Sequence, residues 1–542
     1  MTQTPPRYFW LWHLAALKVI DADFGPLTAP PENTADSSLR AVPAPAITAT
    51  RWDGLTGTAT AALIDTGVSR THPNLATRID TARSIDLTSH RYGAQTLPPT
   101  PDTLPATREQ KKAFFAGLTL SGLHPLHLDP QDLDYLEGMV TDYRGGLGVV
   151  RQLIDAEDTF AAHGTACAGL MVGEPAMVGA DGAAVPPGSL TGSDINPDPN
   201  LLPYFGVDPF STLLSIRTSF EADPYQFIAA FLYAWACKVD IIVLPRGLPD
   251  PVRSRLDPKE ELKADLETWK SRHAADLYQR LHAAPGDPVD PNGAQEGSQP
   301  DRPWNILKHL IIAISRHIPV ICAAGNDGES QVIYPANLAD DDNGVIAVGA
   351  VTPEGFRAGY ANYGDDLTLV APSDDFEVYT RHQSRLNRAD PLIDLHDYAV
   401  GEGKRYAFCP FDLVTTDLPG VFGYDGGTTP WSQIPASPGN PGVGGGYYTA
   451  FGGTSGAACL IGGLGLLAKR ARRGAGLPDL DGLGLKAALI ASCSPTTIVA
   501  PGTRPLTGDL MNADNEDKFD VKYFFGAGLP DASVLIAAVI KP

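Results

Sequence analysis

The sequence has 542 residues, a formal net charge of −22, 43% hydrophobic residues and 19% charged residues. So many apolar residues can form a large core, which excludes global disorder. The acidic balance argues against a nucleic-acid partner, because binding a phosphate backbone needs a basic face. The length allows about three or four domains of about 150 residues, or one large α/β domain with long insertions. The 55 glycines and 48 prolines favour the second organisation, since long ordered loops consume both.

The sequence predicts a cytoplasmic protein without membrane insertion, with secretion as the alternative. The longest apolar run, 227–244, is interrupted by Lys238 and Asp240, and a membrane-spanning helix needs about 20 apolar residues. Aromatic residues at 8–12 imitate a secretory signal, but His13 follows them and no small-x-small cleavage site comes after. The six cysteines have no Cys-x-x-Cys spacing and several lie in apolar stretches, which favours reduced, buried thiols.

Alternating strands and helices follow an N-terminal segment and connector at 1–50. Short apolar runs predict strands, and apolar or amphipathic stretches predict helices. The strands are expected at 61–64, 213–216, 240–244, 320–323 and 344–350, and the helices from 163 onward and at 225–237, 306–315 and 460–473. Insertions are expected at about 85–155, 250–303 and 374–410. The first should contain helices at 108–118 and 130–143, and the second a charged helix at 259–283. The alternation implies a mostly parallel sheet covered on both faces.

A carboxylate follows the first predicted strand, in Ala-Leu-Ile-Asp-Thr-Gly at 62–67. Open α/β sheets keep their sites at the carboxyl ends of strands, so Asp65 is a candidate, with a turn or helix-capping aspartate as the plain alternative. Asp-Thr-Gly also marks aspartic proteases, whose mechanism needs two carboxylates that share a proton. The chain has no second Asp-Thr-Gly or Asp-Ser-Gly, which argues against that class.

Two further segments place polar side chains at the ends of elements. His163 precedes the small residues Gly-Thr-Ala-Cys-Ala-Gly, which let a helix pack tightly and leave the imidazole at its start, facing a cleft. Asn326 follows a buried strand within Ala-Ala-Gly-Asn-Asp-Gly at 323–328. A side-chain amide can donate a hydrogen bond to a developing oxyanion. Taken alone, each residue is better explained as a structural histidine or an ordinary turn asparagine.

A serine is expected to begin a helix in Phe-Gly-Gly-Thr-Ser-Gly-Ala at 451–457. The backbone N–H of Ser455 then lies at the positive end of the helix dipole, which suits an oxyanion. The rival motif is the nucleophile elbow of α/β-hydrolases, Gly-x-Ser-x-Gly with the chain order serine, acid, histidine. Here Ala457 replaces the last glycine and the order is aspartate, histidine, serine. Both the motif and the chain order therefore argue against an α/β-hydrolase.

Together, in the order Asp65, His163, Asn326 and Ser455, these segments resemble the subtilisin-like serine proteases, the subtilase family. The resemblance covers 50–84, 160–250, 304–373 and 411–540, including Gly-Val-Asp-Pro at 206–209, Tyr-Pro-Ala at 334–336, Val-Ile-Ala-Val-Gly-Ala at 345–350 and Gly-Ala-Gly-Leu at 526–529. The family usually has a methionine and a proline where this sequence has Gly456 and Cys459, and Ser-Leu-Gly where it has Pro-Arg-Gly at 245–247.

The resemblance implies a fold and a chemistry. The fold is a subtilisin-like three-layer α/β sandwich with a mostly parallel central sheet, spanning 51–540 with its insertions. The activity is serine endopeptidase action through an acyl-enzyme, in a regulated or processing protease. Ser455 is the nucleophile, His163 the general base, Asp65 the orienting acid, and Asn326 part of the oxyanion hole. The partner is a protein or peptide substrate, with a regulatory protein as a further expectation, and no secreted-type inhibitory prodomain is expected before residue 50.

Specificity and cofactors are expected only in outline. The resemblance to the subtilases implies that two strand ends form the walls of the primary pocket: Pro245, Arg246 and Gly247, and Ala323, Ala324 and Gly325. Arg246 either pairs with an acidic substrate side chain or faces solvent or an insertion carboxylate. No cofactor is required for the chemistry. Structural calcium is common in the family, and the acidic runs at 340–342 and 374–375 are candidates beside a plain solvated surface, so no metal ligand is assigned.

Other readings stay open at this point. The chain could be an idle subtilase-fold binding protein that uses its insertions to recruit partners, or an esterase or amidase with the same triad. Cys167, Cys322 and Cys459 each lie four residues from a candidate site residue. A redox switch is one explanation of this spacing, and small buried hydrophobic side chains are the favoured one.

Overall fold

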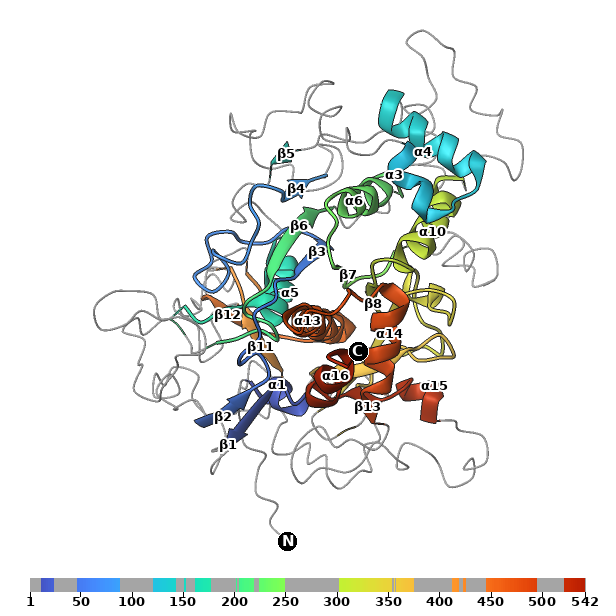
Figure 1. The fold of residues 1–542 in the computed structure, drawn as a ribbon. Coiled ribbons are helices and arrows are strands. Elements are labelled where there is room, and N and C mark those ends of the chain that lie inside the picture. Colours follow the sequence, from blue (N-terminus) through green and yellow to red (C-terminus); the bar gives the residue numbers. More distant parts are fainter. Residues whose placement is uncertain are drawn as a thin grey trace, which may run out of the picture.

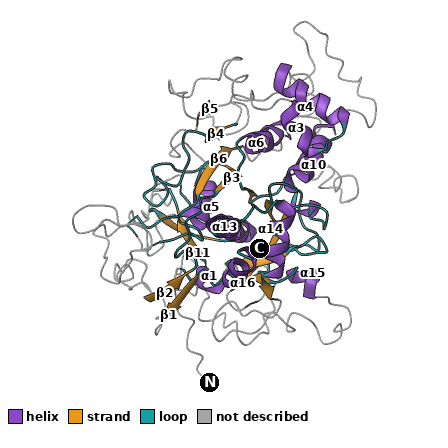
Figure 2. Cartoon of the chain, viewed as in Figure 1, coloured by secondary structure: helices purple, strands orange, loops and turns teal. Residues whose placement is uncertain are grey.

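A computed structural model shows the arrangement of the chain (Figures 1 and 2). It describes residues 11–23, 46–87, 120–142, 151–152, 161–176, 201, 204–218, 224–248, 302–352, 355, 357–374, 412–418, 423–425, 445–494 and 521–541. Among these residues, no helix is both long and apolar enough to cross a membrane.

An eight-stranded sheet forms the centre of the molecule, in the order β10-β9-β8-β7-β3-β6-β4-β5. Its strands are β3 (Thr60–Asp65), β4 (Ile85–Asp86), β5 (Arg151–Gln152), β6 (Thr212–Arg217), β7 (Ile241–Leu244), β8 (Val320–Ala323), β9 (Val345–Val351) and β10 (Leu369–Pro372). Every pairing is parallel except that of β4 with β5. The inner strands are buried along their length, as expected for a parallel sheet with both faces covered. The predicted fold class is confirmed.

Helices cover the sheet on both sides (Figure 1). On one side, α5 (Ala162–Val172) packs against α13 (Gly453–Gly474), and on the other α6 (Pro224–Ala236) packs against α10 (Arg302–Ser315). Glycines in the middle of α13 let the helix approach the sheet closely. A Cβ added at Gly462 would lie 2.8 Å from a methyl group of Val243 on β7. The remaining helices are α1 (Trp12–Ala16), α3 (Leu120–Leu123), η3 (His124–Leu126), α4 (Pro130–Asp142), η5 (Ala336–Leu338), α14 (Gly482–Ala491), α15 (Val521–Phe525) and α16 (Ala532–Val539).

The N-terminal segment packs on this core. Leu11, Leu14 and Leu17 on and beside α1 are fully buried, and the backbone N–H of Ala532 donates to the carbonyl of Leu17. Three two-stranded antiparallel pairs complete the described structure: β1 (Ile20–Asp23) with β2 (Ala46–Thr50), β11 (Leu413–Thr416) with β12 (Tyr448–Phe451), and β13 (Cys493–Ser494) with β14 (Leu529–Pro530).

The insertions agree with the sequence only in part. The helix predicted at 130–143 is present as α4. At the expected start of the first insertion, β4 joins the central sheet beside β6. The helices predicted at 108–118 and 259–283 lie outside the described residues, and so does the third insertion beyond Asp374.

Candidate active site

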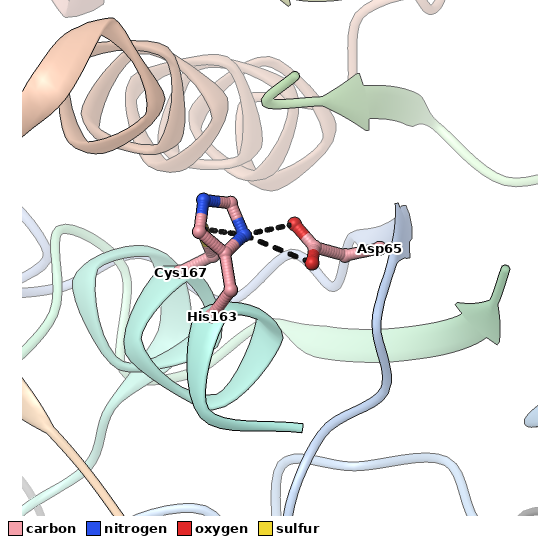
Figure 3. Close-up of side chains that lie close together, drawn as sticks. All are labelled: Asp65, His163 and Cys167. Atoms are coloured by element: carbon pink, nitrogen blue, oxygen red, sulfur yellow. Dashed lines mark hydrogen bonds and ion pairs between the residues drawn. The ribbon is translucent and has the colours of Figure 1, made fainter. Parts of the chain in front are cut away.

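The carboxylate of Asp65 lies at the carboxyl end of β3, in the middle of the sheet. It is 1% exposed. Both of its oxygens accept from Nδ1 of His163, at 2.9 and 2.8 Å (Figure 3). A strand end and a helix start, 98 residues apart in the chain, therefore meet as one Asp–His pair.

A glycine lets α5 approach the turn that follows Asp65. A Cβ added at Gly164 would lie 2.0 Å from the carbonyl oxygen of Gly67, a distance that no side chain tolerates. The N–H of Gly164 also donates to the hydroxyl of Thr66, at 3.2 Å. The small residue after His163 thus allows the close approach that brings the imidazole to the carboxylate.

The electrostatic surroundings keep Asp65 ionised. Burial alone would raise its pKa, but the charge and hydrogen bond of His163, the charge of Arg246 and the N–H of Thr66 together hold the pKa below its usual value. A charged carboxylate accepts the Nδ1–H of the imidazole, so Nε2 is left as the atom that can accept a proton. This tautomer is the one that a general base requires.

Ser455 lies in the first turn of α13, which begins two residues earlier than the predicted serine start, at Gly453. Its side chain is 8% exposed. The first N–H groups of a helix have no partner within the helix, and the dipole of a helix this long favours a negative charge there. Because α13 packs along α5, the serine and the histidine are carried by neighbouring helices.

Asn326 is tied to the same helix start. It follows β8, and its Oδ1 accepts from both the N–H and the hydroxyl of Thr454, each at 2.9 Å. The hydroxyl of Thr454 accepts in turn from the N–H of Gly325, at 3.1 Å. With Oδ1 engaged by Thr454, the amide group Nδ2 is the part of Asn326 available to donate to an oxyanion, and it lies beside Gly453.

A second network at this turn was not predicted from the sequence. Oδ1 of Asp374 accepts from the N–H of Gly453 at 3.1 Å and from the hydroxyl of Tyr360 at 2.5 Å. The hydroxyl of Ser373 donates to the carbonyl of Gly453 at 2.9 Å. These buried groups hold the peptide two residues before Ser455. Sequence reasoning considered Asp374 only as a calcium candidate.

The two predicted pocket walls begin at neighbouring strand ends. Pro245, Arg246 and Gly247 follow β7, and Ala323, Ala324 and Gly325 end or follow β8, which pairs with β7. Arg246 is 8% exposed, and its guanidinium lies 5.0 Å from the ring centre of Phe227 on α6. Burial lowers the pKa of Arg246 to about 10, a value at which it stays charged at neutral pH. Arg246 therefore faces the interior.

Two thiols lie behind the Asp–His pair. Cys167 is one helical turn after His163, with its Sγ 3.7 Å from Nδ1 of His163 (Figure 3), and Cys459 is among the groups that perturb its thiol. Both cysteines are fully buried, and burial raises the pKa of each thiol. All five described cysteines are free. Cys167, Cys322 and Cys459 pack as small buried side chains, and Cys237 and Cys493 are partly exposed. Cys409 lies outside the described residues.

The two acidic runs considered as calcium candidates have other polar partners among the described residues, whereas calcium prefers a set of free oxygen ligands. In the run at 340–342, the ammonium of Lys486 donates to the carbonyls of Asp340 and Asn343, at 2.8 and 3.2 Å, so a cation already occupies this loop. Asp374 is engaged by Gly453 and Tyr360, and residue 375 lies outside the described residues. Asp65, His163 and Cys167 have donor atoms within 4.8 Å of one another, but nitrogen and sulfur are poor calcium ligands.

Comparison with known proteins gives the family. A family model described as the subtilase family matches residues 57–528. Halolysin of Haloferax mediterranei is 43% identical over 53 residues, which are 10% of this chain and 9% of halolysin. Subtilisin BL of Lederbergia lenta is 42% identical over 60 residues, which are 11% of this chain and 21% of that protein. The matched segments thus span only 9% and 21% of these curated relatives.

Solved structures show a general likeness. A protease of Pseudoalteromonas arctica has a TM-score of 0.42 and 16% identity, covering 90% of this chain and 92% of its own. The epidermin leader peptide processing serine protease of Staphylococcus aureus has a TM-score of 0.42 and 15% identity, covering 91% of this chain and 78% of its own. The assignment therefore rests on the family model, whose match includes all four candidate site residues: this chain belongs to the subtilase family.

Proposed function

We propose that this chain is a serine endopeptidase that hydrolyses peptide bonds through an acyl-enzyme. In this proposal Ser455 is the nucleophile, His163 the general base and Asp65 the orienting acid, while Asn326 and the N–H of Ser455 form the oxyanion hole. The observation that carries the proposal is the buried Asp65–His163 hydrogen bond, at 2.8 Å, in a chain of the subtilase family.

The proposed chemistry follows from the tautomer that Asp65 imposes. Nε2 of His163 takes the proton of the Ser455 hydroxyl as the oxygen attacks the scissile carbonyl. In this proposal the amide of Asn326 and the N–H groups at the start of α13 stabilise the charge that develops on the carbonyl oxygen. His163 then gives its proton to the leaving amine, and water hydrolyses the acyl-enzyme by the same steps in reverse.

The test compares the wild type with Ser455→Ala. We expect the wild type to cleave casein and to be labelled covalently at Ser455 by a fluorophosphonate, and the variant to do neither, with kcat lowered about 10⁶-fold. Labelling without peptide hydrolysis, together with turnover of a small ester, would assign an esterase instead. Absence of labelling in a folded wild type would assign an idle binding protein. Equal hydrolysis by both proteins would end the proposal.

Regulation and location are further parts of the proposal. A regulated or processing protease should cleave few proteins, so a proteome-wide cleavage profile of wild type against Ser455→Ala should show a short set of sites. A cytoplasmic location is tested by cell fractionation of the full chain.

The buried charge of Arg246 supports the stabilisation of Asp65, and we propose this role ahead of pairing with an acidic substrate. Peptides varied at the residue before the scissile bond decide between them: faster cleavage after aspartate or glutamate than after leucine would restore the acidic pocket.

A further inference from the structure

Tyr424 is an exposed aromatic side chain close to the proposed catalytic pair. It is 50% exposed. Its ring centre lies 5.9 Å from that of Phe451, and the ring of Phe451 lies 5.5 Å from the imidazole of His163, edge to face. Three rings therefore run from the imidazole outward to solvent. Although the residue is half exposed, partial burial of its hydroxyl, followed by the charge of Asp65, raises the pKa of Tyr424.

The backbone beneath Tyr424 is fixed. Asp417, directly after β11, accepts from the N–H of Tyr424 at 3.0 Å and from the N–H of Asp425 at 2.8 Å. The N–H of Asp417 donates to the carbonyl of Tyr447, directly before β12, at 2.7 Å. A Cβ added at Gly423 would lie 2.6 Å from the carboxylate of Asp417. The aromatic ring is therefore presented to solvent by a turn anchored on a buried carboxyl group.

Among the described residues, Tyr424 packs against the ring of Phe451 and keeps half of its surface exposed. An amphipathic aromatic side chain that is preorganised and half exposed is typical of a contact with a binding partner, because it offers a large apolar area with little conformational entropy to lose. Phe451, which is 9% exposed, is already covered. Tyr424 therefore provides the free surface of this aromatic wall.

We propose that Tyr424 is a specificity-determining residue, whose ring binds a large apolar or aromatic side chain of the first substrate residue on the leaving-group side. The inference rests on the proposed function. His163 must hand its proton to the leaving amine, so the residue that carries this amine passes beside the imidazole. The wall of Phe451 and Tyr424 begins at that imidazole and extends away from it.

The test uses peptides with one fixed acyl side and with phenylalanine, leucine, alanine or aspartate as the first leaving-group residue. We expect the wild type to prefer phenylalanine and leucine over alanine in kcat/KM, and Tyr424→Ala to reduce that preference about 3- to 10-fold. Tyr424→Phe should keep it, because the ring and not the hydroxyl makes the contact. Val534→Ala is the matched control, since Val534 is 46% exposed on α16 and should leave the preference unchanged.

The outcomes separate this inference from the proposed function. An unchanged ratio of phenylalanine to alanine in Tyr424→Ala, with casein cleavage and fluorophosphonate labelling intact, would overturn the role of Tyr424 and leave the protease assignment standing. A loss confined to peptides varied on the acyl side would overturn the proposed position in the same way. Absence of both labelling and cleavage in the wild type would overturn the proposed function, and this inference with it.

Discussion

Replacing Asp65 by asparagine tests the Asp–His pair directly. The substitution keeps the size of the side chain but replaces one carboxylate oxygen by an amide group that donates. Both oxygens of Asp65 lie within 2.9 Å of Nδ1 of His163, so the amide faces a ring nitrogen that now has to accept. The proton of the imidazole then moves to Nε2, where it blocks acceptance of the serine proton.

The expected loss of kcat is large because the Asp65–His163 pair is buried away from water. Asp65 is 1% exposed, so water and salt screen its interaction with the imidazole only weakly. In proteases with this triad, loss of the orienting carboxylate lowers kcat by about 10⁴-fold. That factor corresponds to about 5 to 6 kcal/mol of transition-state stabilisation.

The assay is kcat for a peptide amide at neutral pH, together with the free energy of unfolding in urea. Asp240→Asn is the matched control. Asp240 is also a buried carboxylate paired with a cation, Arg473, and it accepts from the N–H of Thr60 at 2.8 Å. It lies at the amino end of β3, however, and Asp65 lies at the carboxyl end. We expect Asp240→Asn to lower stability and to keep kcat.

Two results would refute this reasoning. If Asp65→Asn retained kcat within about 10-fold of the wild type, the carboxylate would not set the tautomer of the working base. If both variants lost kcat equally, in proportion to their loss of stability, the effect of Asp65→Asn would be one of folding. Only a large loss of kcat confined to Asp65→Asn supports the role proposed for the pair.

Three further predictions concern the oxyanion donor, a buried ion pair and pH. Asn326→Asp keeps acceptor oxygens but removes the amide donor, so kcat should fall about 10²- to 10³-fold with little change in KM; an unchanged kcat contradicts this role. Asp208→Ala leaves the buried guanidinium of Arg470 without its carboxylate and should lower the free energy of unfolding by about 3–5 kcal/mol. The double variant with Arg470→Leu should recover most of that loss in urea denaturation, and no recovery contradicts the pairing. Burial lowers the pKa of His13 to about 3 and of His72 to about 4. Below the unfolded pKa near 6.5 the unfolded chain therefore binds protons that the folded protein does not, and the free energy of unfolding decreases as pH falls. Between pH 6.5 and 5.5 the pair should lose about 2 kcal/mol, and a flat free energy of unfolding over that range would contradict their burial as neutral groups.

The sequence predicted the central sheet well because its inner strands are continuous apolar runs. Residues 320–323 are an example, since they are buried throughout and form β8 with the predicted bounds. The strands near one edge of the central sheet could not be predicted from apolar runs. Strand β4 has two residues, Ile85–Asp86, which is too short for any periodicity to appear. The pair β11 and β12 is separated by about thirty residues of chain, so no local turn signal announces it.

The candidate site could be predicted only where its residues stand in short motifs. Asp65 was found because it follows a buried strand, and His163 because the small residues after it signal a close approach, which Gly164 provides. Asp374 and Tyr424 were missed because their partners are distant in the chain. The contact of Asp374 with Gly453 joins residues 79 apart, and the ring contact of Tyr424 with Phe451 depends on the pairing of β11 with β12.

Two departures from the family pattern, Gly456 and Cys459, are each accommodated by the packing of neighbouring elements. Gly456 stands where the family usually has methionine, and a Cβ there would lie 2.7 Å from a methyl group of Leu413 on β11, so this strand fills the space that a side chain would need. Cys459 stands where the family usually has proline, and its side chain is fully buried. Both changes alter how α13 packs against its neighbours, and neither removes a group that moves a proton or holds an oxyanion. Departures of this kind therefore give no reason to expect an idle site, whereas a change at Asp65 would.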